Sequence, residues 1–114
     1  MTYDGDLAER VRAIVASEPG LSEKRMFGGL AFLLDGRMAL AASGQGGLLL
    51  RCDPGRSAQL VAQPHVEPMV MRGREMRGWL HVHPAAVADD ESLRAWVAEG
   101  VTFVHTLPTK QAAT

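Results

Sequence analysis

The sequence predicts an α+β fold, a two-layer sandwich in which helices pack against one largely antiparallel sheet. Three observations predict it: apolar residues at helical spacing near both ends, two hairpin signals between them, and short apolar runs beside those hairpins. The expected order is helix, three strands, helix, two strands and helix. We expect one domain over residues 1–108 and a frayed tail over residues 109–114.

Composition supports an ordinary soluble domain, with 46% hydrophobic and 22% charged residues. The net charge of −1 provides no overall attraction to nucleic acid, although the middle of the chain is basic and both ends are acidic. The N-terminus lacks a signal core, and no apolar run approaches the roughly 20 residues of a membrane span. We therefore expect a cytoplasmic protein with no membrane contact.

The first helix is predicted by a single apolar stripe. Asp4 or Asp6 can cap its N-terminus, and Pro19-Gly20 ends it. The stripe consists of Leu7, Val11, Ile14 and Val15.

Asp35-Gly36 predicts a two-residue hairpin turn, because both central positions of such a turn need a positive φ. Extending this turn pairs Phe32 with Ala39 and Ala31 with Leu40. One face would then hold Ala31, Leu33, Met38 and Leu40, and the other Phe32, Leu34, Ala39 and the stem of Arg37. Both faces are apolar, so both should be covered. Helices can cover only one side of such a small domain, and we expect a homodimer to cover the second.

The residues just before this hairpin are basic and then glycine-rich. Gly28-Gly29 predicts a bend or bulge at the start of the first strand, where a side chain would clash. Lys24 and Arg25 precede it and are candidates for contact with a partner.

The middle of the chain is predicted to form a third strand, Leu48–Cys52, and a short helix that Asp53-Pro54 opens. Cys52 is the single cysteine, so no disulfide can form within the chain. We expect it to pack as a small hydrophobic residue.

A second hairpin is predicted around residues 72–75, with arms at residues 70–71 and 76–82. The last helix should begin at Asp89 or Asp90. Its apolar residues at helical spacing are Leu93, Trp96, Val97, Val101 and Val104.

Alternation in the second hairpin places His81 and His83 on one strand face, next to Arg77 and Trp79. Two imidazoles at this spacing are weak metal candidates, because the sequence offers no recognisable third ligand. No residue stands in a nucleophile motif, and the carboxylates cluster where helix capping explains them. We therefore expect no catalytic residue, no metal and no cofactor. An enzyme or metal protein that uses His81 and His83 is the weakest alternative.

A stronger alternative is direct binding of nucleic acid by the second hairpin. Three arginines could contact phosphates, and one aromatic ring could stack on a base. These residues are Arg72, Arg74, Arg77 and Trp79. The chain's 5% aromatic content and balanced charge do not favour this alternative.

Several short motifs together resemble the N-terminal domain of the TfoX/Sxy family of bacterial competence regulators. The signature residues are Lys24, Met26, Phe27, Gly28, Gly29, Asp35, Gly36 and Trp96. Leu49-Leu50-Arg51, residues 76–82 ahead of Pro84, and Leu93 also look like the family. The resemblance extends from the first helix to about Pro108.

The resemblance implies an α-β-β-β-α-β-β-α fold, similar to type III secretion chaperones. It also implies a non-enzymatic module associated with transcriptional regulation of DNA uptake. Two-domain members carry a second, helical domain, and we expect a stand-alone first domain here. The leading hypothesis is a small regulatory or adaptor module that contacts an unidentified protein partner and forms a homodimer.

Overall fold

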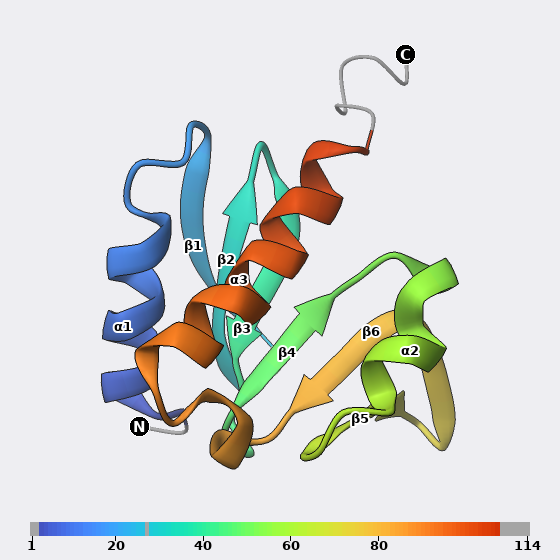
Figure 1. Ribbon diagram of the computed structural model, residues 1–114. Coiled ribbons are helices and arrows are strands. Elements are labelled where there is room, and N and C mark those ends of the chain that lie inside the picture. Colours follow the sequence, from blue (N-terminus) through green and yellow to red (C-terminus); the bar gives the residue numbers. More distant parts are fainter. Residues whose placement is uncertain (1–2, 27, 108–114) are drawn as a thin grey trace.

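A single six-stranded sheet organises the molecule, and every strand in it is antiparallel to its neighbours, in the order β1-β2-β3-β4-β6-β5. The computed structural model describes residues 3–26 and 28–107. The strands are β1 (Leu21–Met26), β2 (Gly29–Leu34), β3 (Arg37–Ala42), β4 (Leu48–Arg51), β5 (Val66–Met71) and β6 (Arg74–Val82). The helices are α1 (Gly5–Val15), α2 (Ser57–Val61) and α3 (Asp90–His105), with short 3-10 turns η1 (Pro54–Arg56) and η2 (Pro84–Val87). Figure 1 shows α1 and α3 on the same side of the sheet, with α2 beside β5 and β6.

This architecture confirms the predicted α+β class. Capping residues set the starts of α1 and α3, as expected, whereas Asp53 caps the 3-10 turn η1 and α2 has no side-chain cap. Asp4 accepts a hydrogen bond from the Leu7 amide at 3.1 Å, and Asp89 accepts one from the Ser92 amide at 2.9 Å. The Ser92 amide also lowers the pKa of the Asp89 carboxyl, because it stabilises the charged form.

The sheet has one strand more than the sequence predicted before the middle helix. β1 is an edge strand whose residues 22–25 are exposed, so its sequence carries no apolar alternation. It pairs with β2 and is also tied to α1, where Arg12 donates two hydrogen bonds of 2.7 and 2.8 Å to Glu23. These bonds lower the pKa of the Glu23 carboxyl. The charged exposed side chains suit an edge that must not pair with other chains.

The β2–β3 hairpin has the predicted turn but not the predicted register along its whole length. Asp35 and Gly36 have φ values of 52° and 80°, as a two-residue turn requires. A register shift then pairs Phe32 with Leu40 instead of Ala39. Leu40 therefore lies in the core beneath the helices, whereas the sequence placed it with Met38 on the other face.

The core beneath the helices, which we call the helix face, includes Phe32, Leu50, Leu80, Leu93 and Val97. The opposite side of the sheet, which we call the second face, carries a smaller apolar cluster. Its buried members are Ala31, Met38, Ala41, Leu49 and Met69, with Met26, Leu33, Met71 and Trp79 packed against them. Both faces are thus apolar, as predicted. The second face is covered to a large extent by side chains of β1, β5 and β6 of the same chain.

Gly28 lies between β1 and β2, and Gly29 is the first residue of β2, where the sequence predicted a bend or bulge. Phe27, the preceding signature residue, lies outside the described residues, as does the tail over residues 109–114. Gly28 has a φ of 73°, and the space where a Cβ would lie is open, whereas a Cβ at Gly29 would overlap the carbonyl oxygen of Ala42. The two glycines are therefore needed for different reasons: backbone conformation at Gly28 and close strand approach at Gly29.

Replacing each glycine by alanine should separate these two requirements. Gly28→Ala should lower the free energy of unfolding by about 1 kcal/mol, the strain of a left-handed alanine. Gly29→Ala should cost at least about 2 kcal/mol, because β2 and β3 must move apart. Urea unfolding followed by circular dichroism measures both values. Equal losses in the two variants would contradict the close-approach argument.

Candidate functional site

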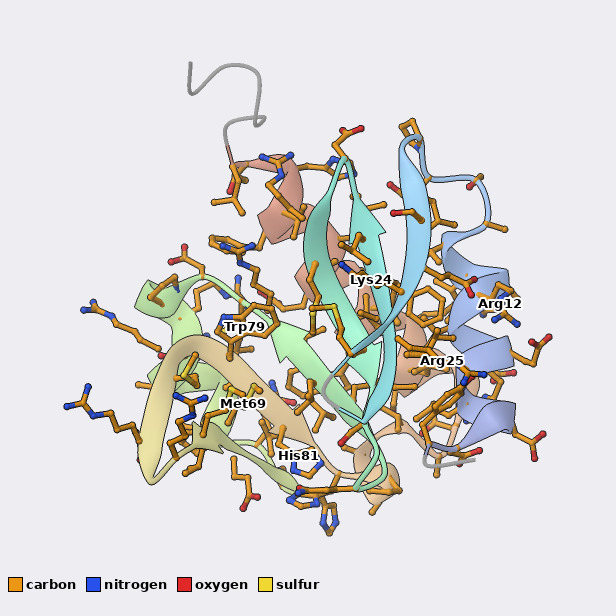
Figure 2. All side chains as sticks on the ribbon, turned by 180° about the vertical axis from the view of Figure 1, so that it is seen from behind. Arg12, Lys24, Arg25, Met69, Trp79 and His81 are labelled. Carbon is orange, nitrogen blue, oxygen red and sulfur yellow. The ribbon has the colours of Figure 1, made fainter. Side chains whose placement is uncertain are left out.

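The second face contains a surface groove next to a cluster of titratable side chains. The groove has a volume of about 380 Å³. Its lining residues are Ser43, Gln45, Leu49, Glu67, Pro68, Met69, Val70, Met71 and His81. Figure 2 views this face, where Met69 and His81 lie on the β5–β6 side. The groove is therefore bounded by β4, β5, β6 and the loop that follows β3.

The strand pairing brings β5 and β6 side chains together in this groove. Glu67 pairs directly with His81 across the two strands. His83 follows on the same face as His81, and the centroids of the two rings lie 4.3 Å apart. The sequence identified the two histidines but missed Glu67, which lies 14 positions before His81 in the chain.

The three side chains form a compact group. Glu67 Oε1 lies 3.1 Å from His83 Nε2 and 3.7 Å from His81 Nδ1. The other ring nitrogen of His81, Nε2, lies 2.9 Å from the carbonyl oxygen of Gly46. His81 is buried, whereas the Glu67 side chain is 57% exposed. His81 is thus held in place by the protein, whereas the Glu67 side chain reaches solvent.

The arginines proposed for nucleic-acid contact lie around the β5–β6 turn. Arg72 and Gly73, with φ values of 53° and 78°, form a two-residue turn, so the hairpin arms are longer than predicted. Arg72, Arg74 and Arg77 are all exposed. The hairpin therefore presents three cations to solvent.

Trp79 does not present a free ring to a base. The guanidinium of Arg51 lies 5.5 Å from the centroid of the Trp79 ring and 5.9 Å from that of Phe103. Burial, together with the charge of Arg37, lowers the pKa of Arg51. One side of the half-buried indole is thus occupied by a cation of the same chain, which weakens the expected stacking role.

Lys24 and Arg25 project from β1 to opposite sides of the sheet. Lys24 pairs with Ala31, a residue of the second face, and Arg25 pairs with Leu30, a residue of the helix face. Figure 2 labels both residues on the curved edge strand. They are exposed, but the structure does not bring them together into one contact site.

The remaining signature residues have structural positions. Asp35 and Gly36 make the hairpin turn, Trp96 is buried in the core, and Met26 packs against the second-face cluster. At these positions, the signature residues are therefore accounted for by their roles in the fold.

Cys52 is an unsuitable nucleophile. It is fully buried, and burial, with smaller contributions from Glu99 and Asp53, raises the pKa of its thiol to about 11. Its amide donates a hydrogen bond of 2.8 Å to the Gly78 carbonyl, which ties β4 to β6. The expected packing role is confirmed, and the neighbouring Arg51 does not produce a reactive thiolate.

The fold and this face define a small α+β domain with helices on one side of its sheet. The chain belongs to the TfoX N-terminal domain family, whose model matches residues 13–104. No curated protein and no solved structure gives a match. Among the described residues, no helix is long and apolar enough to cross a membrane.

The thiol of Cys52 should resist labelling in the folded protein. With a pKa of about 11, roughly one thiol in a thousand is ionised at pH 8, against about a quarter at the usual pKa of about 8.5. Ellman's reagent at pH 8 should therefore react very slowly with native protein and stoichiometrically in concentrated guanidinium chloride. Rapid labelling without denaturant would show that the thiol is accessible and would contradict this environment.

Proposed function

We propose that the protein is a non-enzymatic regulatory module of the competence type that acts by contact with another protein through its β5–β6 hairpin. One observation carries this proposal. Val70 is 59% exposed and Met76 is 36% exposed, and both lie on this hairpin. Exposed apolar side chains next to grooves are common at sites of protein contact.

Each of these side chains borders a different depression. Val70 lines the groove of the second face, and Met76 lines a second groove of about 440 Å³ between α2 and β6. The walls of the second groove include Ala58, Val61 and Trp79. A partner's apolar side chains could therefore enter on either side of the hairpin.

The edges of the sheet favour recognition by side chains over addition of a strand. β5 is an outer strand, but Pro68 lies within it and offers no amide hydrogen. The other outer strand, β1, exposes charged residues including Glu23 and Lys24. We therefore assign partner contact to the apolar hairpin and not to β1.

Replacing Val70 and Met76 together by serine should abolish regulation and leave the fold intact, because both side chains are exposed. In the native host, deletion of the gene should change transcript levels of DNA-uptake genes. Wild type should restore them, and the double variant should not. A matched control replaces Ala95 and Ala98, exposed residues of α3, by serine.

Three results would redirect the proposal. Unchanged uptake transcripts after deletion would remove the competence role. Full activity of the Val70→Ser/Met76→Ser variant would remove the hairpin as the contact surface. Activity lost only in Arg74→Ala/Arg77→Ala, together with salt-dependent binding of a DNA or RNA oligomer by wild type, would favour the nucleic-acid alternative.

The homodimer remains a prediction, but we now expect its contact surface at the β5–β6 hairpin instead of the second face. The chain's own strands cover much of the second face, and Val70 and Met76 are the exposed large hydrophobic residues among residues 3–26 and 28–107, so we place the contact with a second copy at this hairpin. Size-exclusion chromatography with light scattering should give twice the monomer mass of 12.3 kDa at high micromolar concentration. The Val70→Ser/Met76→Ser variant should give the monomer mass. A wild-type monomer under these conditions would contradict the dimer.

A further inference from the structure

We propose that Glu67, His81 and His83 bind a divalent transition-metal ion of the zinc type. The three residues offer one carboxylate oxygen and two imidazole nitrogens, and these ligand atoms all lie within 4.8 Å of one another. The inference does not depend on the regulatory function or on the identity of a partner.

Two of the three ligand distances are close to those around a tetrahedral ion. Two ligand atoms that each lie about 2.0–2.1 Å from a tetrahedral zinc ion are separated by about 3.3–3.4 Å. Glu67 Oε1 lies 3.1 Å from His83 Nε2 and 3.7 Å from His81 Nδ1, on either side of that value. The ligand nitrogens of His81 and His83 lie within 4.8 Å of each other, so the 39% exposed His83 side chain must turn toward buried His81 while Glu67 adjusts to complete the geometry.

The environment of His81 orients it as a ligand. A backbone carbonyl can only accept a hydrogen bond, so the Gly46 carbonyl at 2.9 Å requires a proton on His81 Nε2. The neutral ring then carries its lone pair on Nδ1, the atom that faces Glu67. A histidine that binds a metal through one nitrogen and donates its other N–H to a carbonyl is the usual arrangement of metal sites.

The same arrangement is unfavourable for a neutral His81 without a cation. Nδ1 and the Glu67 carboxylate are then both acceptors, and their 3.7 Å separation is beyond hydrogen-bond range. A proton on Nδ1 would join the two groups as an ion pair, and a metal ion between them would satisfy both as ligands. His83, on the same face, supplies the second nitrogen.

The donor set selects the class of metal. Imidazole nitrogens favour zinc, nickel, cobalt or iron over magnesium and calcium, which prefer oxygen ligands. Three protein ligands leave a fourth position for water or for a group of a partner. Because Glu67 and His81 also line the second-face groove, that position would border the groove.

Calorimetric titration of the full chain, without a purification tag, with zinc chloride tests the site. Wild type should bind one zinc ion per chain. Glu67→Gln and His83→Gln should each weaken the affinity by about tenfold or more, and the double variant should not bind. Both residues are partly exposed, so these substitutions should leave the circular-dichroism spectrum unchanged.

Glu18→Gln and His105→Gln are matched controls. Glu18 Oε1 lies 2.9 Å from His105 Nε2 on the helix side of the molecule, so this pair has one carboxylate and only one imidazole. Both control variants should keep the wild-type affinity. In wild type, NMR spectra of the imidazoles should show zinc-dependent changes at His81 and His83 but not at His105.

Several outcomes would overturn the proposal. These are zinc binding weaker than about 1 mM, wild-type affinity in the Glu67→Gln/His83→Gln double variant, or equal NMR changes at His105. The NMR measurement needs only wild type, so it decides the question even if a variant fails to fold. If Glu67→Gln still regulates the uptake genes, the metal proposal stands, because the titration measures zinc binding directly.

Discussion

The structure depends on one constraint: its sheet is apolar on both faces, but α1 and α3 cover only one of them. β2, β3 and β4 are buried almost throughout, so water must be excluded from the second face as well. The chain meets this requirement with its outer strands. β5 contributes Met69 and Met71 to the second-face cluster, and β1 contributes Met26. The groove borders this cluster, with Leu49, Met69 and Met71 common to both.

A register shift in β5 and the left-handed backbone of Gly78 in β6 decide which side chains of these two strands meet. A regular hairpin extended from the turn at Arg72-Gly73 would pair Glu67 with Gly78. The observed register shift between Pro68 and Val70 pairs Glu67 with His81 instead. Gly78 permits the bend, with a φ of 83° and a carbonyl bonded to the Cys52 amide. The juxtaposition of Glu67 with the histidines is therefore a consequence of a strand bulge.

Much of the fold follows from local sequence patterns that can be recognised without the structure. Asp35-Gly36, the cap at Asp89 and the alternation around His81 each depend on one turn, one hydrogen bond or one strand period, and each is found as predicted. β1 was missed because an exposed edge strand needs no apolar pattern. The positions of Leu40 and Glu67 were missed because a bulge is fixed by packing between strands, which local sequence does not encode. Two imidazoles on one strand were visible from the sequence, but their carboxylate neighbour was not.

The β5–β6 hairpin thus combines two features at opposite ends. Its base holds Glu67 and His81 beside the loop carbonyl of Gly46, and its outer part exposes Val70 and Met76. A cation held at the base would join β5, β6 and that loop, and would restrict the hairpin without covering its apolar outer part. Met69, which lies between Glu67 and Val70 in β5, is buried in the second-face cluster. The two proposed sites share no side chain, but Val70, Glu67 and His81 line the same groove, so a partner in that groove could also supply the ion's fourth ligand.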